Sequence, residues 1–286
     1  MSRGVEGSAM RLPVIGGLIR RRLLINFRVD PDVMGRVLPA PFRPKLQGDH
    51  AIAGICLIRL EQIRPGWLPR FCGISSENAA HRIAVLWDGP SGERCEGVFV
   101  PRRDTGSLLN HLAGGRVFPG EHHLADFEVT DDGSRIDMSV RSRDGFMSLR
   151  LRGRESELLP DSSCFGSLAE SSAYFEGGSI GYSVTRDRCR LDGIRLETES
   201  WRVRPLAVEQ VESSYFADEA MFPRGSVTFD HALIMRDVSH RWRGEPDRVA
   251  GPSINEKAPR VSNGHVDCES LRPIHLLAGP GGELNR

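Results

Sequence analysis

Two adjacent histidines, His122 and His123, offer the clearest opportunity for chemistry in this sequence. They begin a strand-like segment within GGRVFPGEHHLADFEV, residues 114–129. Neighbouring side chains in a strand point to opposite faces, so the two imidazoles cannot share one task. An imidazole titrates near neutrality and can act as a general base or donate a hydrogen bond. We therefore treat both histidines as candidate catalytic residues.

The alternation of apolar residues indicates which histidine faces inward. His123, Ala125, Phe127 and Val129 form an apolar row, whereas the row containing His122 is mixed. Periodicity therefore points His123 into the core. In the alternative interpretation, the inward imidazole only bonds to a backbone carbonyl and has no catalytic role. The pair is not expected to bind a metal ion, because adjacent strand residues cannot easily reach the same ion.

A carboxylate and an amide lie just before another predicted strand. Glu77 and Asn78 stand in SSENAAHRIAV, residues 75–85, and Arg82 follows in the same stretch. A carboxylate at the mouth of a cavity could orient a base or hold a proton, particularly where burial raises its pKa. The alternative is a surface ion pair between Glu77 and Arg82, or a turn contact.

Arginines near a predicted helix are candidates for binding an anion. Arg102 and Arg103 precede Asp104 in PRRDTGS, residues 101–107, and Arg116 lies in GGRVFPG, residues 114–120. Guanidinium groups beside helix N–H groups suit a carboxylate or a phosphate. Alternatively, Asp104 caps the helix and pairs with an arginine, and Arg116 clamps its own loop. The sequence has no nucleophile elbow, Walker loop or dinucleotide motif, so no cofactor is predicted.

Short strands dominate the elements that must position these residues. Periodicity predicts strands at 23–29, 51–60, 81–88, 94–100, 122–130, 134–142, 146–153, 179–185, 194–203, 206–216 and 226–238. Helices are predicted after the N-cap Asp30, at 104–113 and at 167–175. This pattern predicts a mainly β (α+β) fold, a curved antiparallel sheet or barrel with a ligand cavity and a few short helices. Segments 51–60 and 81–88 are apolar on both faces, which predicts a covering layer.

The composition limits the classes of partner. With 38 basic and 38 acidic residues, the net charge is zero, so neither nucleic acid nor an anionic membrane is an expected partner. The stretch LPVIGGLI is too short to span a bilayer and its arginines follow it, unlike those of a signal peptide. Six cysteines without a CxxC pair predict reduced thiols in a cytoplasmic protein and no zinc site. We expect an N-terminal arm at 1–19, one domain at 20–242 and a largely disordered tail at 243–286.

Four stretches resemble the DUF2071 family of uncharacterised proteins, whose fold is related to acetoacetate decarboxylase. They are INFRVDPDVMGRVLPAPF (25–42), SSENAAHRIAV (75–85), GVFVPRRDTGSLLN (97–110) and FDHALIMRDVSHRW (229–242). The resemblance implies the decarboxylase-like fold with a pocket for a small molecule. Because decarboxylase relatives often assemble, it also implies a homo-oligomer.

The resemblance also implies positions for site residues. The decarboxylase relatives use an arginine, a glutamate and a lysine pair, and the first lysine forms a Schiff base with the substrate ketone. These positions fall on Arg20 or a neighbour in IRRRLLINFRV (19–29), on Glu77, and on the pair His122 and His123. The resemblance therefore favours His122 as the inward residue, against the periodicity.

Replacement of the lysine pair makes Schiff-base decarboxylation an unexpected activity. The reaction needs a primary amine, and the only lysine in the matching region is Lys45, which reads as a solvated charge at a turn. Our main hypothesis is a small-molecule-binding protein, an enzyme that acts on a small carbonyl or carboxylate metabolite without a Schiff base. The alternatives are a non-catalytic ligand sensor or carrier, and a structural or interaction protein whose cavity is filled by its own side chains.

Overall fold

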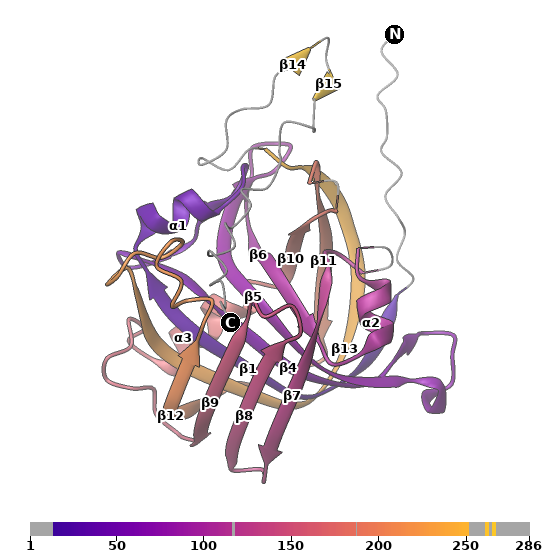
Figure 1. Cartoon of the computed structure of the whole chain (residues 1–286), viewed down its shortest axis with the longest axis vertical. Helices are drawn as coiled ribbons and strands as arrows, with labels where there is room; N and C mark the ends of the chain where they lie inside the picture. Colours follow the sequence, from indigo (N-terminus) through magenta and orange to yellow (C-terminus); the bar gives the residue numbers. More distant parts are fainter. Residues whose placement is uncertain (1–13, 116–117, 187, 252–260, 263–264, 267–286) are drawn as a thin grey trace, which may run out of the picture.

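The computed structural model describes residues 14–115, 118–186, 188–251, 261–262 and 265–266. These residues form a 13-stranded sheet, three short α-helices and a separate two-stranded sheet (Figure 1). The strands are β1 Ile15–Val29, β2 Arg43–Pro44, β3 Leu46–Gln47, β4 His50–Pro65, β5 Ile74–Asp88, β6 Arg94–Thr105, β7 His122–Asp131, β8 Arg135–Ser142, β9 Ser148–Glu155, β10 Ile180–Val184, β11 Arg190–Thr198, β12 Arg204–Ser213, β13 Val227–Val249, β14 Val261–Ser262 and β15 His265–Val266. The helices are α1 Pro31–Val37, α2 Leu108–Ala113 and α3 Leu168–Glu176, with a 3-10 turn η1 at Arg70–Cys72.

The hydrogen-bonded pairings of the main sheet return to β13 by two routes. One route runs from β13 through β1, β4, β5, β6, β7, β8, β9 and β12 back to β13. The other leaves β6 for β10 and β11 and returns to β13 from there. Figure 1 shows the resulting strong curvature, with β13 running along much of the molecule. The predicted fold class, a mainly β protein with a curved sheet and few short helices, is confirmed.

The sheet is mixed rather than wholly antiparallel, which corrects one part of the prediction. The hairpins β7–β8 and β8–β9 are antiparallel, as their short turns predicted. β6, however, pairs in parallel with both β7 and β10. Parallel neighbours need a long crossover, and the segment that contains α2 supplies one between β6 and β7.

Apolar side chains fill both faces of the central strands. On β1, Leu23 and Ile25 enter the main core inside the sheet, whereas Leu24 packs on the opposite face. That second face is covered by Phe165 and by Phe175 of α3. Segments 51–60 and 81–88 are therefore apolar on both faces because a layer covers the outer face of the sheet, as predicted.

The helix caps agree with the sequence at one helix and differ at another. The Asp30 side chain accepts hydrogen bonds from the N–H groups of Asp32 and Val33, so α1 begins as predicted. β6 continues through Asp104, and the N-cap of α2 is Ser107, whose Oγ accepts from the N–H of Asn110. Asp104 was the predicted cap, and its carboxylate instead bonds to Arg102.

The ends of the sheet differ from the predicted domain boundaries. β1 begins at Ile15, within the predicted N-terminal arm, and β13 continues to Val249, past the predicted end at residue 242. Apart from β14 and β15, the rest of the predicted tail from residue 252 lies outside the described residues.

Cys189 is disulfide-bonded, contrary to the expectation of reduced thiols, whereas Cys56, Cys72, Cys95 and Cys164 are free. None of the described helices is long and apolar enough to cross a membrane.

Candidate functional site

β5, β6 and β7 run side by side and bring the candidate residues together. The register places Arg103 opposite Ala80 of β5 and His122 of β7. Residues opposite one another share a face of the sheet, so Arg103 and His122 project to the same side. The paired residues Asp104 and His123 project to the other side. The two histidines line different cavities, whereas Arg103 lines both and Asp104 lines the one that contains His122.

His122 lines a cavity of about 110 Å³, which we call the His122 cavity. Its walls are mainly apolar and include Phe118 and Trp242, and its polar residues include Arg103 and Asn110. Burial, followed by the charge of Arg103, lowers the pKa of His122 to about 3, so the imidazole is neutral at pH 7. Nδ1 lies 3.2 Å from the carbonyl oxygen of Gly120 and, in a neutral ring, donates to it. Nε2 is then an acceptor without a hydrogen-bond partner among the described residues.

His123 lines a larger cavity of about 470 Å³, which we call the His123 cavity. Its side chain is 36% exposed, and Nδ1 lies 3.1 Å from Oδ2 of Asp144. Asp144 also accepts from Arg102, which bonds in turn to Asp104. These contacts hold His123 and Arg102 in the wall of the His123 cavity. Both are therefore partnered by protein carboxylates before any ligand arrives.

Arg103 lines both cavities and has no acidic partner in the described part of the chain. Its Nε donates a hydrogen bond to Oγ of Ser183, at 3.2 Å. Burial lowers the pKa of Arg103 to about 10, which still leaves the guanidinium group charged at pH 7. Its two Nη groups are thus available to an anion. Ser183 comes from β10, so the parallel pairing of β6 with β10 builds this part of the site.

Asn78 belongs to a hydrogen-bonded cluster in the wall of the His122 cavity. Its Oδ1 accepts from Thr105 Oγ1 at 2.8 Å and from Asn110 Nδ2 at 3.2 Å. Its Nδ2 donates to Ser76 Oγ at 2.9 Å, and Asn110 Nδ2 lies 3.0 Å from the same oxygen. Asn78 therefore holds α2 over the cavity, and its own hydrogen-bonding groups are already used.

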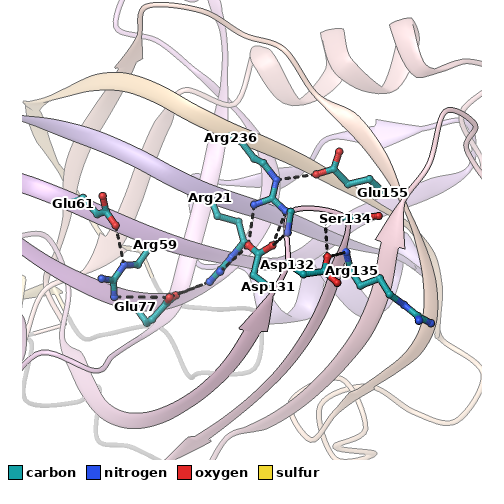
Figure 2. Close-up of polar contacts among 11 residues, drawn as sticks. Arg21, Arg59, Glu61, Glu77, Asp131, Asp132, Ser134, Arg135, Glu155 and Arg236 are labelled. Atoms are coloured by element: carbon teal, nitrogen blue, oxygen red, sulfur yellow. Dashed lines mark hydrogen bonds and ion pairs between the residues drawn. The ribbon is translucent and has the colours of Figure 1, made fainter.

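Glu77 lines neither cavity and belongs to an ion network at another part of the sheet. Figure 2 shows Arg21 between Glu77 and Asp131, with Arg236 bridging Asp131 and Glu155. Arg21 Nη2 lies 3.0 and 2.9 Å from the two carboxylate oxygens of Glu77. Burial raises the pKa of Glu77, an effect that the charge of Arg21 opposes. The structure does not bring Glu77 together with either histidine.

The arginine that pairs with Glu77 is Arg21, whereas the resemblance placed the site arginine at Arg20 or a neighbour. Arg20 is half exposed and pairs with Glu61 and Asp237, and it lies at an irregularity in the pairing of β1 with β4, between Ile19 and Arg21. The stretch IRRRLLINFRV contains three successive arginines, and their different partners depend on the strand register and on this irregularity, which the sequence alone does not reveal.

Two further candidates lie apart from these cavities. Arg82 is buried against the face covered by α3, where Nη2 donates to Oδ1 of Asn26 and the guanidinium carbon lies 4.7 Å from the centre of the Phe175 ring. Arg116 lies outside the described residues.

A serine, a histidine and an aspartate adopt triad-like distances beneath α3. Ser171 Oγ lies 2.8 Å from His231 Nε2, and His231 Nδ1 lies 2.5 Å from Oδ2 of Asp230. All three residues are almost completely buried, and none lines the His122 cavity or the His123 cavity. Nε2 also receives a hydrogen bond from Asn26. The arrangement therefore ties α3 to β13.

Sequence reasoning missed three residues that complete the cavities, Asn110, Ser183 and Tyr215. Asn110 follows the predicted helix cap by a few residues, which is the one local signal that pointed toward it. Ser183 and Tyr215 come from β10 and from the segment after β12, and their approach depends on long-range pairing. No group of three or more potential metal ligands occurs among the described residues.

Solved structures with a similar fold are acetoacetate decarboxylase-like proteins. Acetoacetate decarboxylase from Legionella pneumophila is 11% identical, with 82% of this chain and 86% of that chain covered and a TM-score of 0.53. An acetoacetate decarboxylase-like enzyme from Sphingomonas wittichii is 11% identical, with 87% and 97% covered and a TM-score of 0.51. The enduracididine biosynthesis enzyme MppR, solved with pyruvate, is 13% identical, with 86% and 94% covered and a TM-score of 0.50. At this identity the likeness shows the fold alone.

A search of curated protein sequences found no match. The model of the DUF2071 family, described as uncharacterized conserved proteins, matches residues 19–236. That span runs from β1 into β13 and includes the strands that carry Arg103 and both histidines. Since the match covers most of the chain, this protein belongs to the DUF2071 family and has an acetoacetate decarboxylase-like fold.

Proposed function

We propose that this protein binds a small carboxylate-bearing metabolite, with the carboxylate held by the guanidinium group of Arg103. One observation carries the proposal: Arg103 lines both cavities, and in the described residues no carboxylate pairs with it. A partly buried cation without a counter-ion is unfavourable, and a carboxylate can accept two parallel hydrogen bonds from one guanidinium group. The complex of the similarly folded MppR with pyruvate supports this ligand class.

His122 is the acid–base residue of the proposed enzyme. Its pKa is low because of burial and, in addition, the charge of Arg103. A bound carboxylate would offset that charge and raise the pKa of His122 toward neutrality. Nε2 could then accept a proton from the carbon next to the ligand's carbonyl group and later return it. His123, which is already paired with Asp144, serves to hold the rim of the larger cavity.

The proposed reaction uses no Schiff base. Lys45, the only lysine in the described residues, lies 2.8 Å from Oε2 of Glu96 and donates to the carbonyl oxygen of Tyr174 at 3.3 Å. It lines neither the His122 cavity nor the His123 cavity. Borohydride treatment in the presence of pyruvate is therefore expected to leave no covalent adduct, and an adduct on Lys45 would contradict the mechanism.

Calorimetric titration with pyruvate tests the ligand site. Arg103→Met is expected to weaken binding by about tenfold to a hundredfold, because charge-assisted hydrogen bonds to the carboxylate are lost. Arg43→Met is the matched control, because Arg43 pairs with Asp88 on the surface and lines neither cavity. Equal affinity of wild type and Arg103→Met for pyruvate would rule out Arg103 as the anchor.

Proton exchange separates the enzyme from a carrier. If His122 abstracts a proton, the methyl protons of bound pyruvate should exchange with deuterium in heavy water, as followed by proton NMR. His122→Gln should abolish this exchange and retain pyruvate binding, whereas His123→Gln should retain both. Binding without exchange in the wild type would favour the non-catalytic sensor or carrier.

A further inference from the structure

A third cavity lies between the sheet and α3, apart from the His122 and His123 cavities. Its volume is about 30 Å³, and we call it the α3 cavity. Three cationic side chains line it: Arg22 from β1, Lys45 from the segment before β3, and Arg82 from β5. Its other walls include the rings of Tyr174 and Phe175 on α3. No carboxylate side chain is among its lining residues.

Arg82 is a deeply buried cation with incomplete pairing. It is only 5% exposed, and its hydrogen bond goes to the neutral amide of Asn26. Nε is buried without a partner, and Nη1 has none among the described residues. The guanidinium group faces the Phe175 ring, which attracts a cation but neutralises none of its charge. A buried charge in this state would be stabilised by an anion nearby.

The second arginine of the α3 cavity also lacks an acidic partner. Arg22 Nε donates to Sγ of Cys56 at 3.4 Å, and its guanidinium carbon lies 5.7 Å from the Trp201 ring. Lys45 differs from both arginines, because Glu96 balances its charge. The cavity is therefore bordered by two arginine charges that no carboxylate in the described residues offsets.

We propose that the α3 cavity holds a small monovalent inorganic anion the size of chloride, bound by Arg82 and Arg22. A water molecule could accept hydrogen bonds from Nε and Nη1 of Arg82, but it would leave both charges unbalanced. A metabolite carboxylate is too large for a space of about 30 Å³, so the ion differs from the ligand proposed at Arg103. Because the ion would join Arg22 of β1 to Arg82 of β5 beneath α3, its role is to stabilise this part of the folded sheet.

Thermal unfolding in matched salts tests this site. Wild type is prepared free of chloride in sodium gluconate, whose anion exceeds the cavity, and chloride replaces gluconate at constant ionic strength. A saturable rise in Tm of about 2–5 °C is expected, because an ion bound only by the folded state stabilises it. Arg82→Met should lose this chloride dependence, and Arg43→Met, a change in an exposed ion pair, should keep it. An equal Tm in gluconate and chloride would overturn the proposal.

Crystallography of the unaltered protein keeps the test independent of whether Arg82→Met folds. Crystals grown with sodium bromide should show an anomalous bromide peak within hydrogen-bonding distance of the Arg82 guanidinium group. Water alone in the α3 cavity would contradict the proposal. Neither experiment involves pyruvate, so failure here leaves the carboxylate site at Arg103 unaffected.

Discussion

Arginine side chains in this protein differ in function because their counter-ions differ. Arg21 and Arg236 meet carboxylates of the network in Figure 2, whereas Arg103 meets a serine hydroxyl. In the sequence all three are simply arginines, and residue type alone does not distinguish their roles. Exposure and pairing separate them, and both depend on which residues the sheet brings opposite one another.

Asp131 makes the ion network sensitive to acid. Burial opposes ionisation, but hydrogen bonds from Arg236, from the Gly133 N–H and from Arg21 lower the pKa of Asp131 to about 2. Because the folded pKa lies below the unfolded value, this stability is present above about pH 4 and is lost as pH falls toward 2. Asp131→Asn is expected to reduce the free energy of unfolding at pH 7 by about 2 kcal/mol, measured by urea denaturation. A loss equal to that of Asp88→Asn, a change in an exposed pair, would contradict this.

Glu77 provides a test of the resemblance itself. The resemblance placed a catalytic glutamate here, yet its carboxylate meets Arg21 and lines neither proposed ligand cavity. Glu77→Gln is expected to leave the affinity for pyruvate unchanged. Because the pKa of Glu77 is raised, the same change should alter stability less than Asp131→Asn. Loss of pyruvate binding with unchanged stability would restore Glu77 to the site.

At the scale of elements, polar contacts rather than burial hold α2 in place. None of its residues is buried, and Leu108, Leu109 and Leu112 are each more than half exposed. Its attachments are the Asn110 amide, in the cluster with Asn78, and the ring of His111, whose Nδ1 lies 2.5 Å from the carbonyl oxygen of His122. α2 therefore covers the His122 cavity through a small number of hydrogen bonds.

Asn110→Ala should loosen α2 without unfolding the sheet. We expect amide hydrogen exchange in residues 108–113 to become about fivefold faster, because a local opening loses roughly 1 kcal/mol of hydrogen bonding. Exchange in β13 should stay unchanged and serves as the internal control. Uniform acceleration throughout the protein would show that Asn110 supports global stability instead.

Local chemistry predicted these elements well where the determining contacts are near in sequence. The Asp30 cap, the β7–β8 and β8–β9 hairpins and the two-sided apolar strands all follow from neighbouring residues. In contrast, β6 pairs in parallel with β7 and β10, and Arg103 contacts Ser183, only because distant segments of the chain pair in one particular register. The sequence therefore identified Arg103 and His122 as candidates, but not Ser183 beside one and Asn110 near the other.

At the scale of the whole molecule, buried neutral histidines should control stability in weak acid. Burial lowers the pKa of His81 and His122 to about 3 and that of His240 to about 4. Unfolding restores values near 6.5, so the unfolded chain binds about three more protons in the intervening range. Stability is thus complete above about pH 6.5 and falls as pH decreases toward 4. Denaturant unfolding between pH 7 and 5 measures this slope.

The substitution His81→Phe tests how much one of these three histidines contributes to proton uptake on unfolding. The imidazole packs against the Tyr215 ring, with ring centres 4.1 Å apart and planes tilted by 38°, and both ring nitrogens are buried without partners. An aromatic replacement therefore sacrifices no hydrogen bond and should reduce the proton uptake on unfolding by about one. An unchanged pH slope would show that His81 is not the group responsible.

Cytoplasmic location and assembly into homo-oligomers remain predictions.

Both routes of strand pairing end at β13, which is the last strand of the main sheet to be synthesised. This order has a consequence for folding on the ribosome. β1 is made first, and its partner β13 emerges only after residue 227. At ordinary translation rates of about 5–20 residues per second, one edge of β1 waits roughly 10–40 s for its final neighbour. An unpaired strand edge invites association with other chains, so a nascent-chain chaperone should lower aggregation of this protein during expression.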